Sequence, residues 1–198
     1  MAVSRLRVEA LGELCATGEH QGVLQNAVQA FKYDDARELA MPLADRLVEA
    51  LQILNWPINA VVPVPLYADR QAERGYNQSE LLCQHLALET GIPALPTVLR
   101  RIRKTSQQAL LSEADRRENV RGAFAASADV MGLSILLVDD VATSGSTLRE
   151  CAKALRKQGA GLIFGIAVSH SLSSDWIPQE EDNEYQHSWR WDQDIGGA

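Results

Sequence analysis

The stretch SILLVDDVATSGSTL, residues 134–148, decides the fold of this chain. It begins with aliphatic residues typical of a buried strand and reaches two adjacent carboxylates, Asp139 and Asp140. A loop of hydroxyl residues with one glycine follows, and a helix is expected to begin at about Ser146. With further strands and helices alternating along the chain, this order predicts a parallel α/β sheet.

The chemistry of this loop suits a phosphorylated sugar. Backbone N–H groups and the positive end of the following helix bind phosphate, and hydroxyls add donors without charge. Asp139 and Asp140 can accept hydrogen bonds from neighbouring hydroxyls, such as the 2′- and 3′-OH of a ribose. Strand, acidic pair, loop and helix together resemble the phosphoribosyl diphosphate (PRPP) signature of type I phosphoribosyltransferases.

Other interpretations fit less well. No Lys follows Gly145, so the stretch is not a Walker A loop, and it has no Gly-x-Gly-x-x-Gly fingerprint. A response-regulator receiver places its Asp-Asp pair near its start and needs more chain than follows Asp140. A purely structural role, with both carboxylates merely solvated, conflicts with the repulsion between them and with the low strand propensity of Asp.

Length and composition predict one soluble domain. The chain has 198 residues, 46% of them hydrophobic, and a net charge of −7. That charge argues against strong direct nucleic-acid binding, although basic residues gather at 100–104 and 116–121. The cysteines Cys15, Cys83 and Cys151 are isolated, which indicates neither a zinc ribbon nor a disulfide framework. We expect a cytoplasmic protein without membrane insertion, since no apolar stretch or signal peptide is visible.

Periodicity and turn residues predict the following elements. Helices are expected over 22–53, broken at 32–35, and over 79–90 and 146–158; strands over 59–65, 134–138 and 162–168; a polar loop over 66–77; and a basic, unpatterned stretch over 95–124. We divide the chain into an N-terminal segment at 1–21, a phosphoribosyltransferase-like domain at 22–170 and an acidic, weakly ordered tail at 171–198. The strands at 61–64 and 134–138 are expected inside the sheet.

Two further segments carry candidate binding residues. In 62–79, Arg70 and Arg74 can bind a diphosphate bidentately, although the segment also reads as an exposed loop with a helix cap at Asn77 or Ser79. In 101–124, Arg103 and Lys104 can fold over a bound diphosphate and exclude water. The residues from Arg116 to Glu118 also fit a solvated surface helix.

These segments together resemble the ComF family of phosphoribosyltransferase-like proteins, which includes the gluconate-utilisation relative GntX. The resemblance covers about 22–170, in the family's order and spacing. It is carried by the following residues: Phe31 to Tyr33, Val62 to Pro65, Arg70, Arg74 to Gln78, Thr105, Gln107, Arg116, Asn119, Gly122 to Phe124, and Leu137 to Thr147. Many members begin with a four-cysteine zinc ribbon, which this sequence lacks.

The resemblance implies a type I phosphoribosyltransferase fold with N-terminal helices, acting on PRPP with Mg²⁺ bound to it. The catalytic candidates are Asp139, Asp140, Arg103 and Lys104. The 5′-phosphate would be held by Ala142, Thr143, Ser144, Gly145, Ser146 and Thr147, and the diphosphate by Leu66, Tyr67, Arg70 and Arg74. No direct metal ligand from the protein is expected.

The resemblance leaves two functions open. The first is transfer of phosphoribosyl to an unidentified nitrogen acceptor with release of diphosphate. The second is a non-catalytic role in PRPP sensing, or in competence and DNA uptake, through a competence-protein partner or a second copy of the chain.

Overall fold

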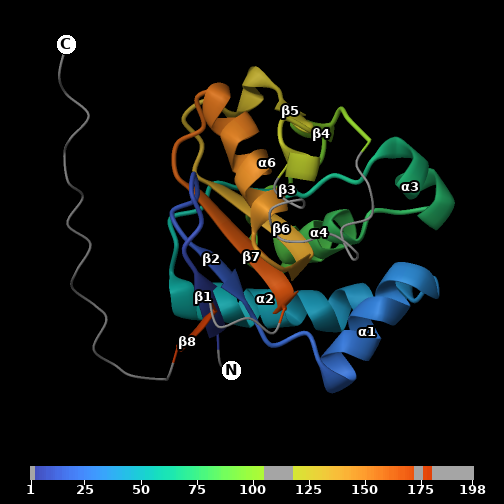
Figure 1. Cartoon of the computed structure of the whole chain (residues 1–198). Helices are drawn as coiled ribbons and strands as arrows, with labels where there is room; N and C mark the ends of the chain where they lie inside the picture. Colours follow the sequence, from blue (N-terminus) through green and yellow to red (C-terminus); the bar gives the residue numbers. More distant parts are fainter. Residues whose placement is uncertain (1–2, 105–117, 172–175, 180–198) are drawn as a thin grey trace, which may run out of the picture.

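A six-stranded sheet forms the centre of the molecule (Figure 1), with strands in the order β3-β6-β7-β2-β1-β8. The structure is a computed structural model and describes residues 3–104, 118–171 and 176–179. The strands of this sheet are β1 (Val3–Leu6), β2 (Leu14–Ala16), β3 (Ala60–Pro63), β6 (Ile135–Ala142), β7 (Ile163–His170) and β8 (Ile177–Gln179). β3, β6, β7 and β2 run parallel, whereas β1 is antiparallel to β2 and β8. The predicted mainly parallel α/β fold is confirmed.

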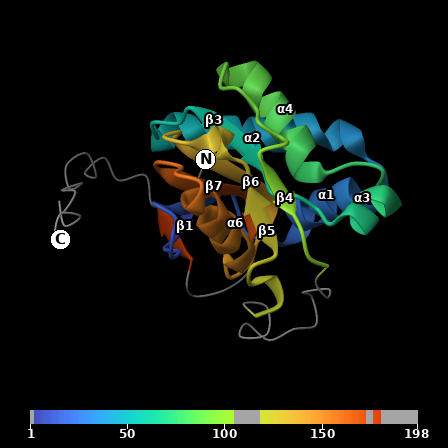
Figure 2. The same cartoon turned by 90° about the horizontal axis from the view of Figure 1, so that it is seen from above.

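Helices cover both faces of the sheet. Figure 2 shows β6 and β7 between α6 (Ser146–Lys157) on one side and α2 (Ala40–Leu54) on the other. α1 (Gly22–Tyr33) and α4 (Gln78–Thr90) pack on the same face as α2 and bury side chains such as Phe31 and Leu86 there. On the α6 face lies a two-stranded sheet of β4 (Leu99–Arg101) and β5 (Phe124–Ala126). Because both faces are covered, the parallel strands can be aliphatic along nearly their whole length.

The helical region predicted at 22–53 is confirmed, together with its break. α1 ends at Tyr33, and Asp35 takes a positive φ of 53° before a short 3₁₀ helix, η1 (Arg37–Leu39), leads into α2. The predicted helices at 79–90 and 146–158 correspond to α4 and α6 within one residue at each end.

The expectation that the strand at 61–64 lies inside the sheet is wrong, because β3 is its terminal strand. β3 is nevertheless fully buried, since the segment after α4 covers its outer edge. Val61 donates a hydrogen bond to the Pro93 carbonyl at 3.0 Å, and Leu95 donates to the Val61 carbonyl at 2.9 Å. A run of aliphatic residues indicates that a strand is buried. It does not indicate that the strand is paired with another strand on each side, because a covering segment can also bury a terminal strand.

Two further expectations are corrected. The polar segment 66–77 contains a helix, α3 (Ala68–Arg74). The stretch 95–124 contains β4, a helical turn at 118–120 and the first residue of β5, and η3 (Ala128–Val130) follows β5. None of the α3 residues is buried, so no apolar periodicity marked this helix. β4 and β5 have three residues each, too few to show an alternating pattern.

Both ends of the described chain add strands to the sheet. β1 and β2 precede α1, and β8 pairs with β1. Residues 172–175 and 180–198 of the predicted acidic tail lie outside the described residues. The boundaries placed at residues 21 and 170 stay predictions. Among the residues that the structure describes, every helix is too short or too polar to cross a lipid bilayer.

Candidate functional site

The acidic pair lies near the carboxyl end of β6, in the middle of the sheet. The strand continues to Ala142, so Asp139 and Asp140 belong to its last four residues and do not follow its end. The carboxyl ends of β3, β6, β7 and β2 meet at one edge of the sheet, because these strands are parallel. That edge is where open α/β sheets bind ligands. The loops that follow these strands therefore come together there, although they are far apart in sequence.

Asp139 is held by groups from two elements. Its Oδ1 accepts a hydrogen bond from the Asp140 backbone N–H at 2.9 Å and another from the Ser79 hydroxyl at 3.2 Å. Burial, and then the negative charge of Asp140, raise the pKa of Asp139 to about 7, while the Lys32 charge and the two hydrogen bonds act in the opposite direction. The carboxyl of Asp139 therefore changes its protonation state close to neutral pH.

Ser79 reaches Asp139 because Asn77 fixes the start of α4. The Asn77 side chain accepts a hydrogen bond from the Ser79 backbone N–H at 3.1 Å and donates one to the Val64 carbonyl, just beyond β3, at 3.2 Å. The helix cap considered for this segment is confirmed at Asn77. Because Asn77 caps the helix, the Ser79 hydroxyl can donate its hydrogen bond to Asp139. The sequence did not predict this contact.

Asp140 has a different partner. The Lys32 ammonium, at the end of α1, lies 3.0 Å from its Oδ1, and the two side chains are 21% and 9% exposed. Nearby, His20 Nδ1 shares a hydrogen bond of 2.9 Å with the Ser169 hydroxyl at the end of β7. Burial, and then the Lys32 charge, lower the pKa of His20. The two carboxylates of the pair thus have different environments, one paired with a cation and the other with a hydroxyl.

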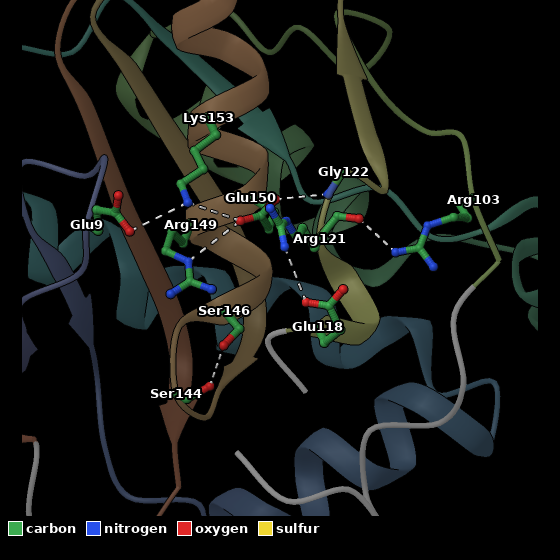
Figure 3. Close-up of polar contacts among 10 residues, drawn as sticks. All are labelled: Glu9, Arg103, Glu118, Arg121, Gly122, Ser144, Ser146, Arg149, Glu150 and Lys153. Carbon is green, nitrogen blue, oxygen red and sulfur yellow. Dashed lines mark hydrogen bonds and ion pairs between the residues drawn. The ribbon is translucent and has the colours of Figure 1, made fainter. Parts of the chain in front are cut away.

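The segment from Ala142 to Thr147 forms a tight turn into α6. Gly145 precedes the helix with a positive φ of 68°, and the Ser144 and Ser146 hydroxyls lie 2.8 Å apart (Figure 3). The Arg149 backbone N–H donates to the Gly145 carbonyl as the first helical bond, at 2.9 Å. In general, N–H groups at the start of a helix have no partner within the helix itself, and helix starts of this kind bind anions. Residues 142–147 are the predicted binding residues for the 5′-phosphate, and we refer to them as the phosphate loop for that reason.

The back of the phosphate loop is held by the C-terminal segment. The Trp176 indole N–H donates to the Thr143 carbonyl at 3.2 Å, and the indole stacks on the His170 ring with centroids 4.5 Å apart. Trp176 is only 5% exposed. The stretch around Trp176, predicted to be part of a weakly ordered tail, therefore supports a loop at the centre of the site.

The four residues predicted to bind the diphosphate lie in two places, the loop after β3 and the helix α3. Leu66 and Tyr67 follow β3 directly, at the same sheet edge as the acidic pair. Arg70 and Arg74 lie on α3, four residues apart and therefore on one face of the helix. Arg70 forms an ion pair with Glu73 at 3.5 Å, and the Arg74 guanidinium lies 5.2 Å from the centre of the Tyr33 ring. The described contacts of these two arginines do not include the acidic pair.

Arg103 and Lys104, the residues predicted to fold over a bound diphosphate as a cover, lie just after β4. Arg103 donates to the carbonyls of Asn119 and Arg121, at 3.0 and 2.7 Å, and Figure 3 shows the second of these bonds. Lys104 donates to Asp69 on α3 at 2.7 Å, and the hydrogen bond to Asp69 raises the pKa of Lys104. Residues 105–117 of the basic stretch predicted at 95–124 lie outside the described residues. The described part of the cover is thus joined to α3 by an exposed ion pair.

Glu150, on α6, connects this helix to the chain around Arg121 and Gly122. Its Oε2 accepts a hydrogen bond from the Gly122 N–H at 3.0 Å, and its Oε1 lies 3.4 Å from the Lys153 ammonium (Figure 3). Glu150 is 8% exposed, and Arg121 beside Gly122 binds Arg103 through its carbonyl. A glutamate within an ordinary helical pattern gives no sequence signal for such a contact. Lys32, in contrast, lies within the stretch from Phe31 to Tyr33 that carried part of the family resemblance.

Within residues 3–104, 118–171 and 176–179, no group of three or more His, Cys, Asp or Glu side chains could hold a metal ion. The cysteines Cys15, Cys83 and Cys151 are all buried and free.

Comparison with known proteins places this geometry in a family. Residues 36–192 match the phosphoribosyl transferase domain model. Competence protein F of Haemophilus influenzae is 40% identical over 161 residues, which cover 76% of this chain and 70% of that protein. DNA utilization protein YhgH of Escherichia coli strain K12 is 33% identical over 156 residues, covering 76% and 68%.

Solved structures give weaker likenesses. Glutamine PRPP amidotransferase from B. subtilis has a TM-score of 0.48 at 20% identity, covering 70% of this chain and 30% of that one. Adenine phosphoribosyltransferase from Saccharomyces cerevisiae has a TM-score of 0.41 at 14% identity, covering 65% and 68%. The sequence matches decide the assignment: the chain belongs to the ComF family of proteins built on the phosphoribosyl transferase domain.

Proposed function

We propose that the protein binds Mg-PRPP at the carboxyl edge of its sheet and transfers the phosphoribosyl group to a nitrogen acceptor, with release of diphosphate. The acceptor's lone pair forms the new bond to C1 of the ribose, and the bond from C1 to the diphosphate oxygen breaks. The electron pair of that bond leaves with the diphosphate, and the acceptor nitrogen releases its proton to solvent. Mg²⁺ enters with PRPP as part of the substrate and neutralises charge on the leaving diphosphate.

One observation carries this proposal. An acidic pair near the end of β6 is followed within a few residues by a glycine turn and the start of α6. Carboxylates accept hydrogen bonds from sugar hydroxyls, whereas N–H groups at a helix start bind phosphate. Asp139 and Asp140 would bind the ribose, and the phosphate loop would bind the 5′-phosphate of the same molecule.

The remaining candidates have roles on the diphosphate side. Leu66 and Tyr67 would present backbone groups to the diphosphate, and Arg70 and Arg74 would add charge. Because the Lys104–Asp69 ion pair is exposed, with side chains 71% and 54% exposed, breaking it requires little free energy. Lys104 and Arg103 would then be able to move toward a bound diphosphate and exclude water.

The direct test is release of diphosphate from Mg-PRPP in the presence of a panel of nucleobases and amines. We expect at least one acceptor to raise the release rate clearly above the rate without acceptor. The variant Asp139→Asn/Asp140→Asn should abolish this increase, which controls for contaminating enzymes.

Two contrary outcomes have different meanings. If Mg-PRPP raises the melting temperature but no acceptor is used, the result favours a non-catalytic PRPP-binding protein. If Mg-PRPP neither binds nor reacts, the proposal fails as a whole.

The names of the relatives favour a second proposal about biological context. Two similar proteins are named for competence and for DNA utilization, and we propose that PRPP binding by this chain serves a related process through protein partners. A direct contact with DNA is not part of this proposal. The net charge of −7 opposes the neutralisation of DNA phosphates by which proteins bind duplexes.

We therefore expect the purified protein to bind duplex DNA weakly at physiological salt, with a dissociation constant of roughly 10⁻⁴ M or higher. Fluorescence anisotropy of a labelled duplex, titrated at several salt concentrations, measures this. Tight binding with a steep dependence on salt would show that the chain contacts DNA directly.

A further inference from the structure

Lys32 lies in the last turn of α1, a helix that carries none of the predicted site residues, yet its side chain reaches the acidic pair. Its ammonium lies 3.0 Å from Asp140 Oδ1, and the Lys32 and Asp140 side chains are only 21% and 9% exposed. The two residues come from the end of α1 and the end of β6, and they meet at the edge where the phosphate loop begins. An ion pair withdrawn from solvent to this extent is screened far less than one on the surface.

The charged and titratable groups around Asp140 come from several elements. Lys32 belongs to α1, His20 to the loop after β2, and Asp139 to the same strand. Arg101 on β4 and the Cys151 thiol on α6 interact with Asp139. Lys32 is the group that forms an ion pair with Asp140 among the described contacts.

Two adjacent carboxylates do not readily carry two negative charges. Each raises the pKa of the other, so that an isolated pair retains a proton over a range of pH. A retained proton turns a hydrogen-bond acceptor into a donor, and the hydroxyls of a ribose then lose a partner. A neighbouring cation reverses this effect, because an opposite charge within hydrogen-bond distance favours the ionised carboxylate.

We propose that Lys32 is a positioning residue of the PRPP site, which orients the Asp140 carboxylate so that it accepts hydrogen bonds from the ribose. The inference rests on the proposed function, and it adds a third member to the group formed by Asp139 and Asp140. Lys32 orients Asp140 through the ion pair, and its charge also lowers the pKa of Asp139. Asp139, bonded to the Ser79 hydroxyl, is the carboxyl of the pair that changes its protonation state near neutral pH.

The experiment compares Lys32→Met, Lys32→Arg and wild type by the affinity for Mg-PRPP between pH 6 and pH 9. Lys32→Met keeps the apolar stem and removes the charge, whereas Lys32→Arg keeps the charge. Lys157→Met, in the exposed last turn of α6, is the matched control for the loss of one positive charge. The titration of PRPP itself cancels, because all proteins are compared at the same pH.

We expect the pH at which Mg-PRPP binding is half-maximal to rise by about one to two pH units in Lys32→Met, because the Lys32 charge that lowers the pKa of Asp139 is lost. At pH 7 the affinity should fall by about fivefold for a shift of one pH unit and by about fiftyfold for a shift of two. At pH 9 it should recover to within about threefold of wild type, since Asp139 is then largely ionised. Lys32→Arg should stay within about threefold of wild type at every pH, and the control should show no shift.

A double-mutant cycle decides whether Lys32 acts through Asp140. If it does, Lys32→Met in an Asp140→Asn background should weaken Mg-PRPP binding by less than about twofold further. The double variant can still be measured if Lys32→Met alone folds poorly. In the double variant Asp140→Asn removes the negative charge that Lys32→Met would leave without an ion-pair partner.

Three results would overturn the inference. A pH profile unchanged by Lys32→Met would show that the charge plays no part in binding. An equal loss at every pH in both Lys32 variants, together with a lower melting temperature, would show that the ion pair only holds α1 on the sheet. Additive losses in the cycle would show that Lys32 does not act through Asp140. If wild type itself does not bind Mg-PRPP, the proposed function fails, and this inference falls with it.

Discussion

Replacing Asp139 and Asp140 together by asparagine should abolish the thermal stabilisation of the protein by Mg-PRPP. The substitutions keep the shape of both side chains and turn charge-assisted hydrogen bonds from the ribose hydroxyls into neutral ones, each about 1–2 kcal/mol weaker. Two such losses weaken binding on the order of 30- to 1000-fold. Melting temperatures of wild type and variant, each with and without saturating Mg-PRPP, measure the effect.

The single substitutions should affect the free protein in opposite directions. The pKa of Asp139 is raised to about 7 in the folded state, so folding favours its neutral form. The stability lost by ionising Asp139 grows as the pH rises from about 4 to about 7 and is complete above that range. The Asn side chain of Asp139→Asn resembles the neutral carboxyl and cannot ionise. The substitution should therefore raise the free energy of unfolding at pH 8 by on the order of 1–3 kcal/mol, and this gain should disappear toward pH 4.

Asp140→Asn should destabilise the free protein, because it leaves the partly buried Lys32 ammonium without its ion-pair partner. We expect a loss of about 1–2 kcal/mol at pH 7. Glu89→Gln, at an exposed position of α4, is the control for the loss of one negative charge. A ligand-induced rise in melting temperature that is equal in wild type and the double variant would exclude these carboxylates as the ribose-binding groups.

Gly145→Ala should be among the most damaging single substitutions in the phosphate loop. Gly145 has a φ of 68°, which other residues adopt at a free-energy cost of about 1–2 kcal/mol. An added Cβ would also lie 2.8 Å from Val8 Cγ2 and 3.1 Å from Leu14 Cδ2, closer than carbon atoms pack. Together, backbone strain and overpacking should lower the free energy of unfolding by about 2–5 kcal/mol.

Gly91→Ala is the matched control, because Gly91 ends α4 with a φ of 72° and an added Cβ would meet nothing within 4 Å. It isolates the cost of the backbone conformation, about 1–2 kcal/mol. Urea unfolding of both variants gives the comparison. Equal losses at the two glycines would show that the N-terminal segment around Val8 yields to the added methyl group and does not brace the phosphate loop. Mg-PRPP should stabilise the Gly91 variant as it does wild type and the Gly145 variant much less.

The longer elements could be predicted because their signals are local. A run of aliphatic residues at 134–138 and a helical spacing of apolar residues in 22–53 are visible within a few turns of chain. The three-residue strands β2, β4, β5 and β8 have no such signal, since their pairing with distant strands creates them. α3 was not predicted for a different reason: the helix is exposed and has no apolar face that a periodic pattern could show.

The sequence by itself determined the order of acidic pair, glycine turn and helix start, since neighbours in the chain form all of it. The tertiary structure alone decided which groups hold these residues. The Lys32 ammonium, the Ser79 hydroxyl and the Trp176 indole reach Asp140, Asp139 and Thr143 from distant elements. Parallel strands bring their carboxyl ends to one edge, so groups far apart in the chain meet there. Neither the identity of such a partner nor its effect on a carboxyl pKa is encoded in the residues next to it.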